Sequence, residues 1–195
     1  KFDIIFDLMG FTSENRISLF KNRIAPIQIS WIGYCNTLGL DEMDYIFSDK
    51  NLIFDKEEEF YTEKVIRLES IWNAHTGLDV KRYKLSTPAI KNGYITFGSF
   101  NNFNKISHKT LESWISILKS VDNSKLLLKS STKLNTDYFK EKLKKNIVNK
   151  QIQFINEFDD FKDHLNYYDK IDLALDTFPY NGVTTTFEAI WKGVP

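Results

Sequence analysis

The sequence of 195 residues has a single cysteine, Cys35, and no long hydrophobic run. A lone cysteine forms neither an internal disulfide nor a cysteine-based zinc cluster, and it fits a reducing compartment. No stretch approaches the roughly 20 consecutive apolar residues that a membrane-spanning helix needs, and Lys1–Ile4 does not begin a secretory leader. We therefore expect a cytoplasmic protein with no membrane partner.

The sequence also lacks an excess of either charge, because 26 basic residues balance 26 acidic ones. A neutral balance gives no support for a general binder of nucleic acid or membrane surfaces, although it is compatible with a local charged patch. Histidine is scarce, and the spacing of His75, His108 and His164 does not form a metal-ligating pattern. We expect no nucleic-acid partner and no metal site.

The sequence does contain apolar segments that alternate between strand and helix patterns. The predicted strands are residues 2–8, 27–34, 44–48, 64–68, 94–100, 126–128, 151–155 and 171–175. The predicted helices are residues 13–21, a helix beginning at Ser107, residues 133–147 and 158–168, and a last helix that ends at Gly193. The regular alternation in the second part predicts an α/β fold with a parallel sheet and right-handed crossovers.

The segment Gly77–Gly93 has no periodicity and predicts a domain boundary. We divide the chain into a first half at 1–84, a linker at 85–93 and a second half at 94–195. Residues 2–8 have the pattern of a buried strand with nothing before it, and the chain stops after Gly193 where another strand is expected. We therefore predict a fragment whose first half is incomplete and whose second half is nearly complete, with a truncated C-terminus.

The stretch Ile171–Gly193 predicts a strand, a tight loop and a helix. In the loop, Asn181 and Gly182 favour positive φ, and Gly182 lets the backbone approach a ligand closely. The first N–H groups of the helix are unpaired and its dipole is positive, so an anion is favoured there. Thr184 and Thr185 add hydroxyl donors, which makes phosphate the expected ligand.

Glu188 shares a helix face with the two threonines, because it follows them by four and three residues. A carboxylate there repels phosphate but accepts hydrogen bonds from the hydroxyls of a ribose. The pattern therefore suggests a nucleoside diphosphate. An ordinary strand-to-helix turn with a solvated glutamate explains the same residues equally well.

A second polar loop, Asn101–Lys105, also follows a predicted strand. Both loops are expected at the carboxyl edge of one sheet, where α/β folds bind ligands. There Lys105 would neutralise the charge that develops on a departing diphosphate, replacing the divalent metal of other nucleotide-sugar enzymes. Taken alone, a lysine favours the interpretation as a surface residue, but its position directly after a strand and next to an amide-rich loop favours the functional one.

Several separated motifs resemble glycosyltransferase family 41, the protein O-linked N-acetylglucosamine transferases. The matching stretches are Phe6–Thr12, Arg23–Tyr34, Met43–Ile46, Phe97–Ile106 and Leu175–Thr186. They occur in the family's order and extend over nearly the whole chain. The resemblance is nearest to the bacterial members, because the large insert of the animal enzymes is absent near the domain boundary.

The resemblance implies a GT-B fold of two Rossmann-like halves, with the donor bound mainly by the second. It implies an inverting, metal-independent transfer of N-acetylglucosamine from UDP-GlcNAc to Ser or Thr of a protein acceptor, without a cofactor. Carried over, Lys105 contacts the diphosphate with Asn102 beside it, and His164 packs on uracil. The phosphate and ribose positions are Asn181, Gly182, Thr184, Thr185 and Glu188.

Three departures from the family bear on the donor and acceptor. Gly33–Gly39 differs from the usual Gly-Tyr-Pro-Gly-Thr-Ser-Gly run, and Val183 stands where the animal enzymes have histidine. The lysine usually found shortly before His164 is not aligned, since Phe161 occupies its position and Lys162 follows.

The alternatives are a UDP-glucose-dependent protein N-glucosyltransferase, a non-catalytic UDP-binding module and a flavodoxin-like domain. Asp3 and Asp7 lie near the predicted cleft, yet neither is assigned as general base, because the family resemblance identifies none and part of the first half is missing. We expect Asp7 to cap its loop. Whether helical repeats precede residue 1 stays open.

Overall fold

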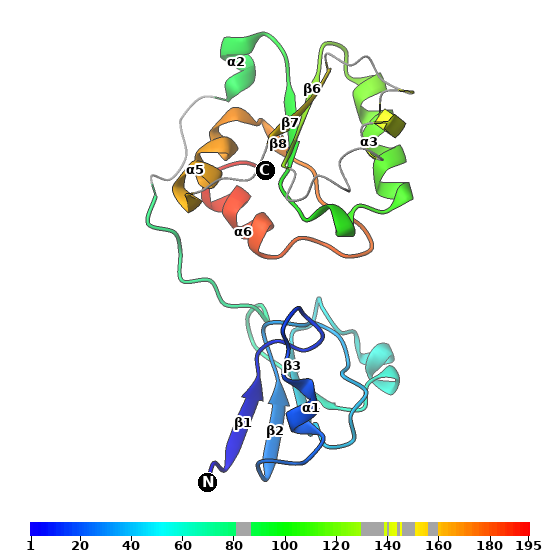
Figure 1. Ribbon diagram of the computed structural model, residues 1–195, viewed down its shortest axis with the longest axis vertical. Helices are drawn as coiled ribbons and strands as arrows, with labels where there is room; N and C mark the ends of the chain where they lie inside the picture. Colours follow the sequence, from blue (N-terminus) through cyan, green and yellow to red (C-terminus); the bar gives the residue numbers. More distant parts are fainter. Residues whose placement is uncertain (81–86, 130–138, 140, 144, 146–150, 156–159) are drawn as a thin grey trace. The chain divides into compact units, whose positions relative to one another are not determined.

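The computed structural model describes residues 1–80, 87–129, 139, 141–143, 145, 151–155 and 160–195. These residues form two compact units, unit 1 at Lys1–Thr76 and unit 2 at Gly77–Pro195 (Figure 1). The division falls at the start of the aperiodic segment, earlier than the linker that we placed at 85–93. Part of that linker is the helix α2, Pro88–Asn92, which belongs to unit 2, whereas residues 81–86 lie outside the described residues.

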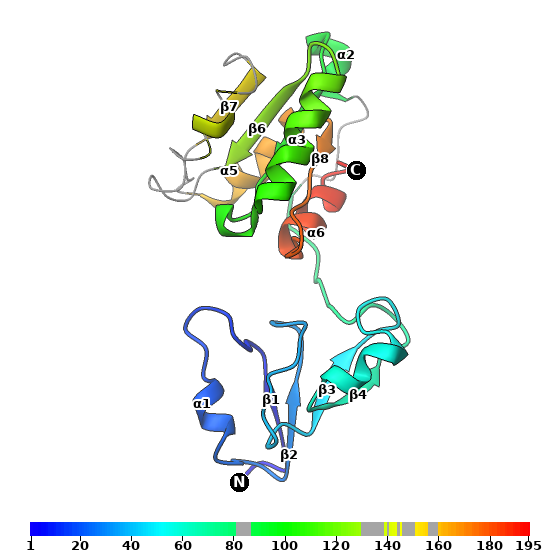
Figure 2. The ribbon, with the colours of Figure 1, turned by 90° about the vertical axis from the view of Figure 1, so that its right-hand side faces the viewer.

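Unit 1 is built on four parallel strands in the order β1-β2-β3-β4 (Figure 2). Their bounds are Ile4–Asp7, Ile27–Ser30, Tyr45–Ser48 and Lys64–Arg67. All four lie within the predicted strands, but the burial expected for residues 2–8 is wrong, since Ile4 and Phe6 of β1 are 49% and 41% exposed. A 3-10 helix, Asp55–Phe60, precedes β4.

The helix predicted at 13–21 is much shorter than expected, because α1 contains only Ile17–Phe20. Glu14 has a left-handed backbone with φ 61°, which a right-handed helix does not tolerate. The side chain of Asn15 accepts a hydrogen bond from the backbone N–H of Ile17. The local turn therefore replaces the first helical turns.

The interior of unit 1 contains one fully buried amide, Gln28. Its Nε2 donates to the carbonyl oxygens of Phe20 and Glu42, both at 2.8 Å, and its Oε1 accepts from the N–H of Ile24. A buried amide costs stability unless it is hydrogen-bonded, and here both of its polar atoms have partners. Gln28 thus ties α1 to the loop before β3.

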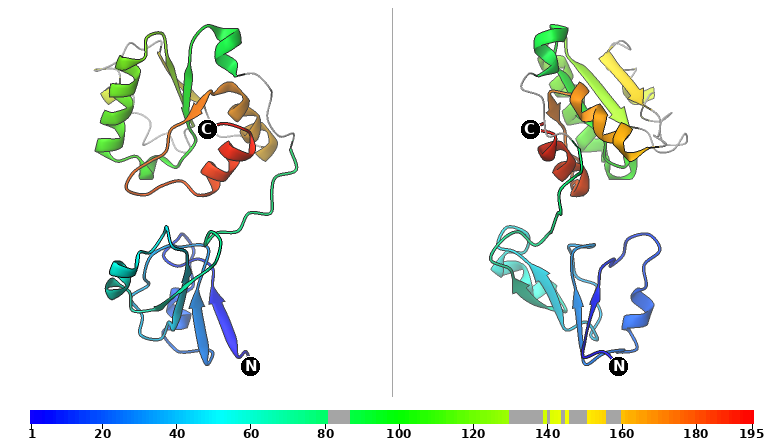
Figure 3. Two further views of the ribbon diagram at one scale, coloured as in Figure 1. Left: turned by 180° about the vertical axis from the view of Figure 1, so that it is seen from behind. Right: turned by 90° about the vertical axis from the view of Figure 1, so that its left-hand side faces the viewer.

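Unit 2 is a parallel sheet in the order β7-β6-β5-β8 with helices on both faces (Figures 1 and 3). The strands are β5 Thr96–Ser99, β6 Lys125–Lys129, β7 Ile152–Ile155 and β8 Leu173–Ala174. The helix α3, His108–Ser120, covers one face, and α5, Phe161–Asn166, and α6, Thr184–Trp191, cover the other. The predicted α/β class and parallel sheet are confirmed.

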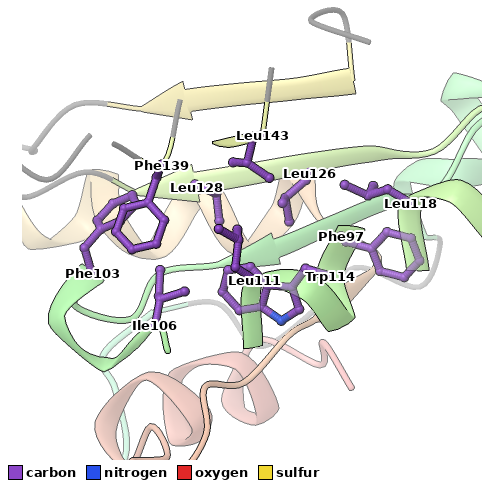
Figure 4. Packing of buried hydrophobic residues seen from close by; sticks show 10 residues of the cluster. All are labelled: Phe97, Phe103, Ile106, Leu111, Trp114, Leu118, Leu126, Leu128, Phe139 and Leu143. Atoms are coloured by element: carbon purple, nitrogen blue, oxygen red, sulfur yellow. The ribbon is translucent and has the colours of Figure 1, made fainter. Parts of the chain in front are cut away.

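The strand β6 is buried on both sides, since successive side chains point to opposite faces. Leu126 and Leu128 pack with α3, whereas Leu127 packs with α5 and α6. Figure 4 shows the cluster on the α3 side: Phe97, Phe103, Ile106, Leu111, Trp114, Leu118, Leu126, Leu128, Phe139 and Leu143. Phe139 and Leu143 are helical, as predicted for 133–147, and most of that segment lies outside the described residues.

Strand pairing places two loops side by side at the carboxyl edge of this sheet. β5 pairs with β8 in parallel, with Phe97 opposite Leu173 and Gly98 opposite Ala174. The chain therefore leaves both strands at the same edge, toward Asn101 and toward Asp176. Among the described residues, none of the helices has the length and apolar character to span a bilayer.

Candidate functional site

The loop after β5 is anchored by an apolar side chain and exposes polar ones. Phe103 is buried in the core, and Phe103–Lys105 forms a short 3-10 turn. Oδ1 of the exposed Asn102 accepts a hydrogen bond of 3.0 Å from the N–H of Asn104, which caps this turn. Asn102 therefore shapes the loop that presents Lys105.

Lys105 lies against the second loop. Its Nζ donates to the carbonyl oxygen of Asn181 at 3.2 Å and lies 4.4 Å from the centroid of the Tyr180 ring. The convergence of the two loops that the sequence predicts is therefore present in the structure.

The second loop is organised by Asp176, a residue that the sequence reasoning missed. Its Oδ1 accepts from the N–H groups of Thr177 and Gly182, both at 2.8 Å, and its Oδ2 accepts from Asn181 Nδ2 at 3.0 Å. One carboxylate thus fixes both ends of the loop. Its position directly after a predicted strand was the available signal.

Gly182 is required for space, and the positive φ that we expected at Asn181 and Gly182 is wrong. A Cβ at Gly182 would lie 2.4 Å from Thr185 Oγ1 and 2.6 Å from Asn101 Oδ1. Any larger residue would displace one of these side chains. The sequence predicted that Gly182 lets the backbone approach a ligand closely. In the structure, the backbone at Gly182 lies close to the side chains of Thr185 and Asn101.

The first turn of α6 offers hydrogen-bond donors. No described residue accepts a hydrogen bond from the backbone N–H of Thr184, Thr185 or Thr186, and Val183 provides no side-chain cap. The hydroxyl of Thr185 donates to Asn101 Oδ1 at 2.7 Å. Of the two hydroxyl donors that we predicted, only that of the exposed Thr184 has no partner among the described residues.

Glu188 is buried, so the alternative of a solvated glutamate is wrong. Only 3% of Glu188 and 6% of His164 are exposed, and His164 Nε2 lies 2.9 Å from Glu188 Oε2. The phenol of Tyr168 donates to the same oxygen at 2.8 Å. Sequence reasoning did not identify Tyr168, although it follows His164 by four residues.

The chemistry of the partners fixes the histidine tautomer. A carboxylate only accepts hydrogen bonds, so Nε2 of His164 carries the proton toward Glu188. Its Nδ1 then accepts from Lys129 Nζ, which lies 3.4 Å away at the end of β6. Burial and the charge of Glu188 raise the pKa of Tyr168, which keeps its phenol a donor.

Lys129, His164 and Glu188 line an open pocket of about 400 Å³ at the carboxyl edge of the sheet. Its lining residues are Phe100, Lys129, Asp160, Phe161, His164, Thr185 and Glu188. The predicted positions thus form two neighbouring groups. Lys105 and Asn181 meet between the loops, and His164 and Glu188 meet in the pocket, with α6 extending from the second loop to Glu188.

Asp7 in unit 1 has the geometry of a loop cap. Its carboxylate is buried and accepts from the N–H of Gly10 at 2.7 Å and of Met9 at 3.3 Å. These contacts stabilise the turn after β1.

Comparison with known proteins identifies the family. The model of glycosyl transferase family 41 matches residues 2–77 and 73–195. The barley and Arabidopsis thaliana proteins named "Probable UDP-N-acetylglucosamine--peptide N-acetylglucosaminyltransferase SPINDLY" are 36% and 35% identical over the whole chain. The Arabidopsis protein of the same description named SEC is 27% identical. The chain spans 21% of the barley protein and 22% of the Arabidopsis SPINDLY protein.

Solved structures of related proteins have the same fold. A mutant of the Thermobaculum terrenum O-GlcNAc transferase superposes with a TM-score of 0.87 at 30% identity, over 99% of this chain and 37% of that one. The pneumococcal O-GlcNAc transferase GtfA, at 11% identity and a TM-score of 0.59, shares the fold over 98% of this chain and 40% of its own. With its two parallel-sheet units, the chain has the GT-B fold and belongs to glycosyltransferase family 41.

Proposed function

We propose that the protein to which this chain belongs transfers N-acetylglucosamine from UDP-GlcNAc to Ser or Thr hydroxyls of a protein acceptor. The observation that supports this most is the contact of Lys105 with the loop that leads into the N-terminus of α6. It occurs in a family 41 chain whose relatives are named peptide N-acetylglucosaminyltransferases.

The positive groups at this edge of unit 2 suit a diphosphate. The ammonium of Lys105, the first N–H groups of α6 and the hydroxyl of Thr184 all lie along the loop after Asp176. Donors held in place before the reaction stabilise charge that develops on a leaving group. We propose that they do so for departing UDP without a metal ion, so that activity persists in excess EDTA.

The pocket beside this loop suits the nucleoside. Glu188 lines it and would accept hydrogen bonds from the ribose hydroxyls, while the His164 ring would pack on uracil. His164 is itself held by Glu188 and Lys129. The base and ribose would therefore meet side chains whose orientation is already fixed.

In the proposed reaction the acceptor hydroxyl attacks the anomeric carbon from the side opposite UDP. The new bond forms between the hydroxyl oxygen and that carbon as the bond to the diphosphate oxygen breaks, which inverts the configuration. The electron pair leaves with UDP, and the hydroxyl proton passes to a base that we do not assign. Holding both reactants in line lowers the barrier by removing their freedom of motion.

The test is Lys105→Ala in the full-length protein. Loss of one preorganised donor to a developing charge typically costs about 100-fold or more in turnover. We expect such a loss, with affinity for UDP in calorimetry changed far less. Lys109→Ala, in the exposed first turn of α3, is the matched control and should leave turnover unchanged. Unchanged turnover in Lys105→Ala would reject the leaving-group role.

A UDP-glucose donor with an asparagine acceptor is the second candidate, because Val183 and the Gly33–Gly39 run depart from the family pattern at positions that bear on the donor and acceptor. Mass spectrometry of peptides incubated with each UDP sugar distinguishes the two by the added mass and the residue modified. Binding of UDP without any transfer would instead support a non-catalytic module. GDP is the control for the base, and tighter binding of GDP than of UDP would contradict the assignment of the pocket to uracil.

We further propose a bacterial-type enzyme of the cytoplasm. Cys35 supports a reducing compartment. The missing insert near the domain boundary supports the bacterial type. Cell fractionation tests the compartment, and the source of the full-length gene tests the bacterial type.

A further inference from the structure

Asn101 connects three segments of unit 2 through one amide. The residue follows β5 and is only 7% exposed. Its Nδ2 donates to Asp176 Oδ1 at 3.2 Å, and its Oδ1 accepts from Thr185 Oγ1 at 2.7 Å. The end of β5, the loop after β8 and the first turn of α6 therefore meet at this side chain.

The orientation of the amide follows from its partners. Asp176 carries a carboxylate, which only accepts, so the NH₂ group of Asn101 must face it. The amide oxygen then faces Thr185, whose single hydroxyl proton is used in that contact. Thr185 consequently offers an acceptor and no hydroxyl donor to a ligand, in contrast to Thr184.

The same contacts extend to Lys105. Asp176 holds Gly182 and Asn181, and the carbonyl oxygen of Asn181 accepts from Lys105 Nζ. Gly182 packs so closely on Asn101 that no Cβ fits between them. A change at Asn101 would therefore alter the loop that holds the lysine.

We propose that Asn101 is a positioning residue: without touching substrate, it sets the loop at 176–182 and the start of α6 so that Lys105 and the helix N–H groups address the same diphosphate. This inference rests on the proposed function, because it takes that edge as the diphosphate site. Asn102, which the sequence singled out, caps its own turn and does not make these contacts.

The test is a double-mutant cycle in the full-length enzyme with Asn101→Ala and Lys105→Ala. If Asn101 acts by placing Lys105, the two losses are not independent. We expect Lys105→Ala to reduce kcat about 100-fold in the otherwise unsubstituted enzyme and less than about 10-fold in the Asn101→Ala background. If Asn101 had only a structural role, Asn101→Ala would lower the melting temperature, and the reductions in kcat caused by the two substitutions would multiply.

Ser124→Ala is the control for loss of a buried hydrogen bond. Ser124 is 1% exposed, and its Oγ donates to the carbonyl oxygen of Val121, a residue that belongs to neither loop. We expect the reductions in kcat caused by Ser124→Ala and by Lys105→Ala to multiply. If Asn101→Ala does not fold, Thr185→Val replaces it in the cycle, because it removes the hydroxyl that donates to the amide oxygen of Asn101. Lys105→Ala must then reduce kcat less in the Thr185→Val background than in the unsubstituted enzyme.

The outcomes separate this inference from the proposed function. No effect of Lys105→Ala on turnover would reject the proposed leaving-group role. A large effect of Lys105→Ala that is equally large in the Asn101→Ala and Thr185→Val backgrounds would leave that role intact and reject the positioning role. A reduced effect in either background supports it.

Discussion

The phenol of Tyr168 donates a hydrogen bond of 2.8 Å to Glu188 Oε2, the oxygen that His164 Nε2 also contacts at 2.9 Å. Two donors on one oxygen leave the carboxylate little rotational freedom. Tyr168 is 2% exposed and comes from the turn after α5, whereas Glu188 comes from α6. The proposed ribose acceptor is thus held from a different segment.

Tyr168→Phe tests whether the hydrogen bond from Tyr168 to Glu188 is required for nucleotide binding. The variant keeps the ring and removes only the hydroxyl, leaving a buried acceptor with one donor fewer. We expect the free energy of unfolding to fall by about 1–3 kcal/mol and the affinity for UDP to weaken about tenfold. Calorimetry and urea unfolding measure the two effects. Tyr167→Phe is the control, and equal losses in both variants would argue against a specific role.

Alkaline pH probes the same hydroxyl. Burial and the neighbouring Glu188 raise the pKa of Tyr168 above its ordinary value of 10.0, so above pH 10 the unfolded chain loses this proton while the folded chain keeps it. The unfolded state then binds fewer protons, and stability falls with rising pH by up to about 1.4 kcal/mol per pH unit. Tyr168→Phe should remove that part of the slope. Parallel pH curves for the two proteins would show that the phenol is not linked to folding.

The strands were predictable because most are short runs rich in apolar and β-branched residues with turn residues on either side. The helix at 13–21 was not, since Glu14 adopts a left-handed conformation that apolar periodicity does not reveal. The site was predictable in part. The sequence places Asn101 and Asn102 equally after β5, and only the packing of β5 against β8 determines which side chain turns inward. The contact of Tyr168 with Glu188 depends on tertiary packing in the same way.

Gly182→Ala should damage the site without damaging the core. The new methyl group would overlap Thr185 Oγ1 and Asn101 Oδ1 at 2.4 and 2.6 Å, forcing the loop and the helix start apart. We expect UDP affinity to fall by at least about tenfold, with a change in unfolding free energy of about 1–3 kcal/mol. Ser116→Ala, at an exposed position of α3, is the control and should change the affinity little. Unaltered affinity in Gly182→Ala would show that the close packing of these three residues is dispensable.

We expect Asp49 to make unit 1 sensitive to acid. The residue is 4% exposed, and its carboxylate accepts from the N–H groups of Asn51, Leu52 and Trp72 at 2.8, 3.0 and 2.7 Å. Burial opposes ionisation, yet these hydrogen bonds prevail and lower the pKa of Asp49 below 3.8. Because the folded pKa is the lower one, the stabilisation is present above about pH 4 and is lost as pH falls through the folded value.

Asp49→Asn separates this linkage from general acid denaturation. The amide places an NH₂ group toward backbone donors, so we expect about 1–3 kcal/mol lower stability at pH 7 and a weaker dependence on pH below 4. Peptide-resolved hydrogen exchange of the segment from β3 to Trp72 measures local opening in unit 1. Asp41→Asn, at an exposed position, should behave like the parent. If Asp49→Asn lost protection on acidification as steeply as the parent does, another group would have to carry the acid sensitivity of this unit.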